Sequence, residues 1–279
     1  RTFCLEAEEK LGEHMHPDVT LDCIAMGRSM AAWDAGDYRM IREIHAKTID
    51  RLAKAGAAFF ACPDNTSHIA LETPGPEFAL PGLNIADVVA DEASRLGMSK
   101  VAVLGTKYTM EGPVYARALP ARRIEAVFPT ADERNEINRI IFSELVKGVF
   151  TDPSRQAYVD VINRLKGEGC DGVALVCTEI PLLITPDVSP LPTLDSTRLL
   201  ARAALLSLCV IALFNGCEGC DRPPVVGDGV ARQGELPPKV LLGHGRRYGA
   251  LNALPVQAGH LSRGQERVHV VHNGRKLIL

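Results

Sequence analysis

The stretch DGVALVCTEIPLL, residues 171–183, joins an apolar run to a polar turn. The run 171–176 is short and rich in Val, Leu and Ala, as in a strand that is buried on both faces. Cys177, Thr178 and Glu179 follow it at once, and each side chain can ionise or form hydrogen bonds. In open α/β sheets, ligands bind beyond the carboxyl ends of parallel strands. The stretch therefore predicts an α/β fold with a site at the end of this strand.

Strand and helix patterns alternate on both sides of this stretch, from about residue 17 to 205, which predicts parallel sheets. We expect strands at Val19–Met26, Ala57–Ala61, Lys100–Leu104 and 171–176. We expect helices at Asp37–Ala55, at Ile85–Leu96, after a capping box from Thr130 to Glu133, and at Ser154–Lys166.

A second polar turn lies in FACPDNTSHIA, residues 60–70, after the apolar run 57–61. Its polar side chains are Asp64, Asn65, Thr66, Ser67 and His68. One interpretation is purely structural, because Asp, Asn, Thr and Ser at such a turn cap the next helix. A third loop, LGTKYTMEG at 104–112, carries the hydroxyls of Thr106 and Thr109 in a setting that can bind anions. Three polar clusters at strand ends favour one shared cleft.

The bulk composition is that of an ordinary globular enzyme-sized chain. Of its 279 residues, 46% are hydrophobic and 23% charged, and the net charge of −3 gives no electrostatic case for nucleic acid or a membrane surface. The longest apolar run, Ala203–Phe214, is too short to span a bilayer and is typical of a buried helix. The eight cysteines are irregularly spaced and no signal peptide is visible, so we expect a cytoplasmic protein.

Cys177 and Asp64 come from two strand ends and could face each other across a substrate carbon. Taking a proton from one face of a carbon and returning one to the other requires two acid/base groups. A thiol suits this role when hydroxyl donors or a helix N-terminus lower its pKa, so we expect the pKa of Cys177 to lie below that of a free cysteine. With no Gly-rich nucleotide fingerprint and no convincing metal spacing, the chemistry is expected to need no cofactor and no metal.

Five segments of the chain match a known family. They are PDNTSH (63–68), VAVLGTKYTMEGPVY (101–115), INRIIFSELVKGVF (137–150), VCTEIPLL (176–183) and PTLDSTRLLARAA (192–204). Together they resemble the aspartate/glutamate racemase superfamily, the cofactor-independent amino-acid racemases, over about residues 1–205. Asp64 stands where the family usually has its first catalytic Cys, and Cys62, two residues earlier, is expected to pack beneath the site.

The resemblance implies two parallel-sheet α/β domains with the active site in the cleft between them. The first domain would comprise residues 1–97 and 187–205, and the second residues 98–186. RTFCLEAEEK, at 1–10, resembles the helix that follows the family's first strand, so that strand is expected to be missing here.

The resemblance also implies roles for individual residues. Cys177 and Asp64 would be the acid/base pair of an amino-acid racemase, an isomerase acting on an aspartate- or glutamate-like substrate. The predicted substrate-binding residues are Asn65, Thr66, Thr109, Thr178 and, as a partner for a side-chain carboxylate, Arg28. His68, Glu179 and Thr106 would support them, and a homodimer is possible.

Two other kinds of protein stay open at this point. One is a one-sided decarboxylase or isomerase of the same fold that uses Cys177 alone. The other is a catalytically inactive homologue that binds a small molecule, an interpretation favoured by the absent first Cys.

The C-terminal region, residues 206–279, lacks a sustained hydrophobic period and is rich in Gly, Pro and Arg. Three interpretations stay open: the region forms a hairpin-like appendage, is disordered, or comes from a shifted reading frame. In each case it is expected to contribute little to the catalytic fold. Its Cys217-Glu-Gly-Cys220 motif has no second pair at zinc spacing, so a metal site there is not favoured.

Overall fold

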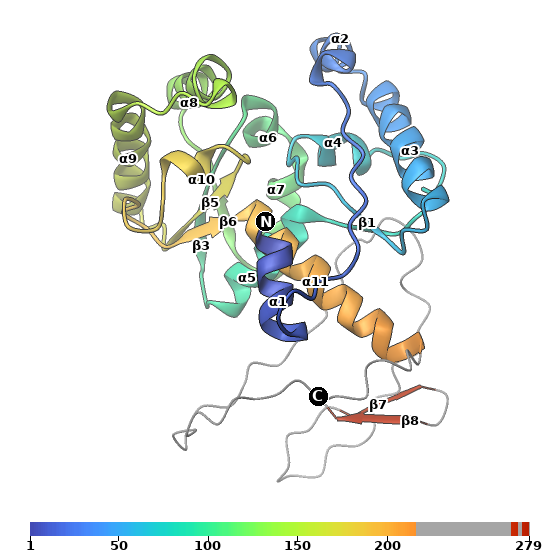
Figure 1. Ribbon diagram of the computed structural model, residues 1–279. Coiled ribbons are helices and arrows are strands. Elements are labelled where there is room, and N and C mark those ends of the chain that lie inside the picture. The colour runs from blue at the N-terminus through green and yellow to red at the C-terminus, as the bar shows by residue number, and fades with distance from the viewer. Residues whose placement is uncertain (216–268, 273–274, 279) are drawn as a thin grey trace, which may run out of the picture.

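The computed structural model describes residues 1–215, 269–272 and 275–278 (Figure 1). The α-helices are α1 (Thr2–Leu11), α2 (Met30–Asp34), α3 (Tyr38–Lys54), α4 (Ser67–Leu71), α5 (Ile85–Arg95), α6 (Lys107–Glu111), α7 (Pro113–Ala118), α8 (Ala131–Ser143), α9 (Asp152–Gly167), α10 (Ile180–Leu183) and α11 (Ser196–Asn215). Short 3₁₀ turns are η1 (Met26–Arg28), η2 (Pro120–Arg122) and η3 (Leu145–Lys147). The strands are β1 (Phe60–Ala61), β2 (Gly82–Leu83), β3 (Lys100–Gly105), β4 (Glu125–Val127), β5 (Gly172–Val176), β6 (Thr193–Asp195), β7 (His269–His272) and β8 (Arg275–Ile278).

The larger sheet has the strand order β4-β3-β5-β6, and all of its pairs are parallel. Alternate residues of β3 point to opposite faces, so Leu104 packs in one buried cluster and Val103 in another. Helices α8 and α9 supply the first cluster, with Ile140 and Ile162 among its buried residues, and α5 and α7 supply the second. The sheet is therefore covered by helices on both faces, which explains why its central strands are almost wholly apolar.

A smaller parallel sheet pairs β1 with β2 on the other side of the molecule (Figure 1). Phe60 packs with Ile49 of α3 and with Phe78 and Leu71 in a separate buried cluster. The molecule is thus a mixed α/β protein with two parallel-sheet units, as predicted.

Helix boundaries follow the capping residues that the sequence contains. The side chain of Asp37 accepts a hydrogen bond from the Met40 backbone N–H and starts α3. Thr130 and Glu133 form the predicted reciprocal capping box of α8. These contacts satisfy backbone donors that the first helical turn leaves without partners. The helices predicted at 37–55, 85–96 and 154–166 are all present.

The predicted strand at Val19–Met26 is wrong. Residues 17–25 have no regular secondary structure, and the segment ends in η1. Val19 is 62% exposed and Leu21 is 86% exposed, so the apolar pattern does not mark a buried face. Within the described residues no strand pairs with this segment, and a strand is stable only when a neighbour satisfies its backbone groups.

Two features bear on the domain boundaries predicted at 97/98 and 186/187. Strand β6 hydrogen-bonds to β5 in the larger sheet, although it follows the second boundary. The helix after it, α11, continues to Asn215, ten residues beyond the predicted end of the first domain at 205. The boundaries stay a prediction.

Little of the C-terminal region belongs to the described structure. β7 and β8 pair as an antiparallel hairpin. The Cys217–Cys220 motif lies outside the described residues, as does most of the region whose contribution to the fold was predicted to be small. Searched over the described part of the chain, no helix is long and apolar enough to cross a membrane.

Candidate active site

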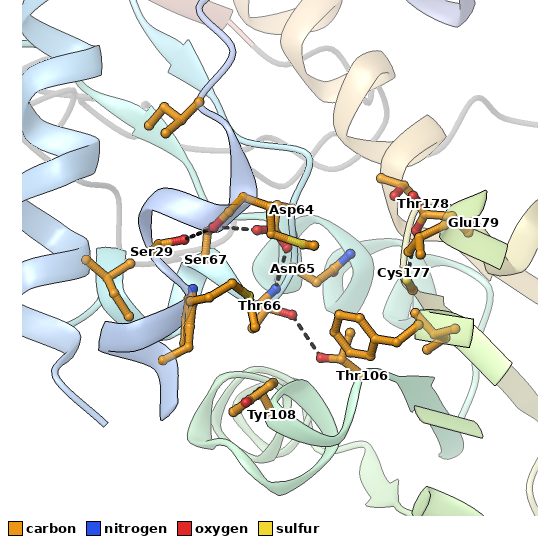
Figure 2. A pocket seen from close by; sticks show the side chains of 18 of the residues that line it. Ser29, Asp64, Asn65, Thr66, Ser67, Thr106, Tyr108, Cys177, Thr178 and Glu179 are labelled. Atoms are coloured by element: carbon orange, nitrogen blue, oxygen red, sulfur yellow. Dashed lines mark hydrogen bonds between the residues drawn. The ribbon is translucent and has the colours of Figure 1, made fainter. Parts of the chain in front are cut away.

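A pocket of about 280 Å³ lies where the two parallel-sheet units meet. This volume is near the lower end of the roughly 300–1,000 Å³ that is usual for small-molecule sites. Its polar lining residues are Ser29, His45, Asp64, Asn65, Thr66, Ser67, Thr106, Tyr108, Cys177, Thr178 and Glu179, most of which Figure 2 labels. The turn after β1, the loop after β3 and the end of β5 all contribute, so the shared cleft predicted from the strand ends is present.

Asp64 is exposed to the pocket and is held by the turn in which it lies. One carboxylate oxygen accepts from the Thr66 backbone N–H at 3.0 Å, and the other accepts from Ser67 Oγ at 2.5 Å. Both bonds are local, as in an Asx turn, and Asp64 lies two residues before Thr66, the N-cap of α4. They fix the carboxylate at the pocket wall, as Figure 2 shows.

Three threonine hydroxyls meet behind Asp64. Thr66 Oγ1 lies 2.9 Å from both Thr106 Oγ1 and Thr109 Oγ1, which are 3.0 Å from each other. Thr66 follows β1 and the other two follow β3, so this triangle of hydroxyls joins the turns of the two units. Thr66 and Thr106 line the pocket, whereas Thr109 is fully buried behind them.

Asn65 is held in a buried chain of hydrogen bonds. Its Oδ1 accepts from the Tyr115 hydroxyl at 2.6 Å, and its Nδ2 donates to Ser196 Oγ at 3.0 Å. Ser196 in turn donates to the Leu175 carbonyl oxygen of β5. The amide therefore ties the turn after β1 to the larger sheet, and one Nδ2 hydrogen is left for a ligand.

Cys177 lines the pocket at the end of β5, on a different element from Asp64 (Figure 2). Its thiol donates to Glu179 Oε2 at 3.0 Å. Burial raises the pKa of Cys177 well above its usual range, and the hydrogen bond to Glu179 and the charge of that carboxylate raise it further. The prediction that this pKa lies below that of a free cysteine is wrong. The following helix, α10, has only four residues, and an adjacent carboxylate disfavours the thiolate.

The remaining predicted site residues lie in different surroundings. Thr178 is exposed and lines the pocket. His68 is fully buried, its Nε2 lies 3.0 Å from the Cys62 carbonyl oxygen, and it does not line the pocket. Arg28, in η1, is exposed and is not among the lining residues. Cys62 packs against the cluster around Phe60, as predicted, and burial raises the pKa of its thiol to about 12.

Several lining residues were not predicted from the sequence. Ser67 holds the Asp64 carboxylate, and His45 lines the pocket from α3. Burial lowers the pKa of His45, while the charge of Asp64 opposes that shift. His45 lies one turn after Ile41 on α3, which is the only signal in the sequence that places it on the buried face. Tyr108, in α6, also lines the pocket.

A metal site is not formed by the side chains described here: in that part of the chain no three His, Cys, Asp or Glu residues lie in a group that could hold an ion.

Two parallel-sheet units with a polar pocket at their strand ends define the class of two-domain α/β proteins that bind a small molecule between the units. Residues 11–204 match the family model described as Asp/Glu/hydantoin racemase. The chain belongs to the Asp/Glu/hydantoin racemase family.

Individual relatives agree with this assignment. The chain is 24% identical over 155 residues to the broad specificity amino-acid racemase RacX of Bacillus subtilis (strain 168). The matched residues are 56% of this chain and 66% of RacX, so the match spans just under two thirds of the length of RacX. Crystal structures of an Asp/Glu racemase candidate from Yersinia pestis and of an aspartate racemase homologue from Pyrococcus horikoshii OT3 are each 29% identical, with TM-scores of 0.66 and 0.62. In both comparisons 75% of this chain and 91% of the other chain are covered.

Proposed function

We propose that the protein is an amino-acid racemase, an isomerase that inverts Cα without a cofactor, with Cys177 and Asp64 as its two acid/base groups. The observation that carries the proposal is that both side chains line one pocket while coming from two separate parallel-sheet units. A substrate carbon held between them would have one proton-transfer group on each face. Membership of the Asp/Glu/hydantoin racemase family also supports racemase activity.

The hydrogen bond from Cys177 to Glu179 suggests how the thiol becomes a base. In our proposal Glu179 accepts the thiol proton, and the thiolate then removes the proton from Cα. The electron pair of the broken C–H bond is delocalised into the substrate carboxylate, where hydroxyl and backbone donors near Thr66 stabilise it. Protonated Asp64 delivers a proton to the opposite face. Asp64 then regains a proton from solvent and Glu179 loses one, which balances the cycle, and the other enantiomer runs the steps in reverse.

Binding of a zwitterionic amino acid would lower the pKa of Cys177 from its raised value in the free protein. The substrate ammonium is a positive charge next to the thiol, and an opposite charge nearby favours the thiolate. Catalysis would therefore begin only when the pocket is occupied.

A one-sided decarboxylase or isomerase that uses Cys177 alone is the second candidate. It is favoured by the hydrogen bonds of Asp64, because both carboxylate oxygens already accept from Thr66 and Ser67. In that case Asp64 serves only as a cap. The resemblance predicted an aspartate- or glutamate-like substrate, with Arg28 as a candidate partner for its side-chain carboxylate. Arg28 does not line the pocket. The cytoplasmic location and the homodimer stay predictions.

Asp64→Asn separates the two candidates, because Asn caps a helix nearly as well as Asp but transfers no proton. If Asp64 is the second acid/base group, this variant keeps the thermal midpoint of the parent and loses racemisation in both directions. Asp64→Cys, which restores the family pattern, should keep or raise activity. Asp37→Asn is the control, since the Asp37 carboxylate also accepts a backbone N–H at the start of a helix, α3, and does not line the pocket. Racemisation by Asp64→Asn at the parent rate would show that Asp64 is only a cap.

A further inference from the structure

The pocket is lined by apolar side chains on both sides of its polar groups. On one side they come from residues 24–33 and from α3, and on the other from the region of α8 and η3. They include Ile24, Met26, Trp33, Ile44, Phe142 and Val146. Met26 is 57% exposed and Val146 is 43% exposed, so apolar surface on both sides of the pocket is open to solvent. Contact with an apolar group would remove that surface from water, which is favourable.

The charged groups of the pocket are almost all negative. Asp64 and Glu179 line it, and among the described lining residues there is no Lys or Arg. Burial lowers the pKa of His45, which disfavours a positive charge on this imidazole, although the charge of Asp64 opposes that shift. A bound amino acid brings one ammonium, which the charge of Glu179 can neutralise, and one α-carboxylate, for which hydroxyl and backbone donors are available. A second substrate carboxylate would be a further anion with no cation beside it.

We infer that the substrate is an amino acid with an uncharged, apolar side chain, such as leucine or methionine, and not aspartate or glutamate. This inference rests on the proposed function and adds the class of substrate to it. The polar residues around Asp64 and Cys177 hold the α-groups, and the side chain lies against apolar residues such as Trp33 and Phe142. Specificity then comes from two sources: burial of an apolar side chain, and repulsion of a side-chain carboxylate by the negative charge that the proposed cycle keeps in the pocket, first on Glu179 and then on the Cys177 thiolate.

The test is a panel of single enantiomers of leucine, methionine, phenylalanine, aspartate, glutamate and lysine, each assayed for inversion by chiral chromatography. One apolar group in a hydrophobic pocket changes kcat/KM by roughly tenfold or more. Leucine and methionine, whose side chains end in apolar groups, should therefore exceed aspartate and glutamate, whose side chains end in a carboxylate, by at least that factor. Equal or faster turnover of the acidic amino acids would overturn the inference and leave the racemase activity standing. A preference for lysine would also overturn it. If no member of the panel is inverted, the proposed function itself fails.

A positive charge introduced into the pocket wall tests whether the lack of a cation there disfavours acidic substrates. Val146→Arg places a guanidinium at an exposed position of the pocket wall, where folding should be little affected. It should raise kcat/KM for glutamate relative to leucine several-fold, because an arginine pairs well with a carboxylate. Leu206→Arg is the matched control: it adds the same charge at a half-exposed leucine of α11 that does not line the pocket, and the glutamate-to-leucine ratio should not change. No change in this ratio for Val146→Arg would contradict the inference.

Arg28 provides the remaining check. If its side chain reaches a substrate carboxylate, Arg28→Ala would lose glutamate turnover while keeping leucine turnover, and the inference would be wrong. An unchanged ratio supports it.

Discussion

The two proposed acid/base residues have very different surroundings. Asp64 is exposed and accepts two hydrogen bonds from its own turn. Cys177 is buried and donates to the carboxylate of Glu179. In the proposed mechanism the aspartate therefore exchanges its proton with solvent directly, whereas the thiol passes its proton to Glu179.

The raised pKa of Cys177 leads to a prediction about its reactivity. Because only the thiolate is alkylated readily, Cys177 should react with iodoacetamide more slowly near neutral pH than the exposed Cys23. Glu179→Gln removes a negative charge beside the sulfur, so it should lower the pKa of Cys177 and speed its labelling. Mass spectrometry of tryptic peptides over time measures both rates. Glu77→Gln, the same change at an exposed position that does not line the pocket, is the control.

Labelling of Cys177 ahead of Cys23 would show that the thiol is already activated in the free protein. An unchanged rate in Glu179→Gln would remove Glu179 from the proposed proton path.

The sequence was informative about which residues meet at the site and less so about their chemistry. Cys177 and Asp64 were placed at strand ends because apolar runs precede them, and that inference needs only local sequence. The pKa of Cys177 depends on how far the packed protein excludes water and on where the Glu179 carboxylate points. Neither can be read from the residues around position 177.

At the scale of elements, the central strands approach each other closely just before the site. Gly105 of β3 pairs with Val176 of β5, the residue before Cys177. A Cβ added at Gly105 would lie 2.6 Å from Val176 Cγ2 and 2.9 Å from the Val176 backbone oxygen. Backbone cannot move aside as a flexible side chain can. The position of Cys177 therefore depends on a glycine in the neighbouring strand.

Gly105→Ala should shift Val176 and destabilise the protein. Overpacking of a well-packed core typically costs about 1–3 kcal/mol, and each kcal/mol lowers the thermal midpoint by roughly 2–4 °C in a domain of this size. Gly167→Ala is the matched control, because nothing lies within 4 Å of its added Cβ at the end of α9. Calorimetry should show a lower midpoint for Gly105→Ala only. Equal midpoints for the two variants would contradict the close approach of β3 and β5.

Helices whose ends are marked by a capping residue or a glycine were predicted better than strands, which form only by pairing with another strand. α3 begins at its capping Asp37 and ends before Gly56, whose φ of 88° suits a glycine, and both residues are visible in the sequence. The strand expected at Val19–Met26 fails because strand formation requires a neighbouring strand. An alternating pattern alone does not supply one.

At the scale of the whole molecule, the pocket is assembled from segments that are far apart in the chain. Residues near 24–33, 45, 64–67, 106–108, 141–146 and 176–179 all line it. Family resemblance predicted the two units and the cleft between them. It did not predict the composition of the pocket wall, because Met26 and Val146 meet the cavity only through the packing of both units. The substrate class is therefore a property of the assembled structure.

Turnover of a single enantiomer in D₂O, followed by proton NMR and mass spectrometry, tests the two-base mechanism most directly. Each base would deliver a solvent-derived deuteron to its own face, so the inverted product should carry deuterium at Cα while the remaining starting enantiomer keeps protium at early times. Cys177→Ser should lose this reaction. Deuterium uptake with retained configuration, or release of CO₂, would show one-sided chemistry. The absence of both exchange and inversion with every amino acid of the panel would contradict proton transfer at Cα by this protein.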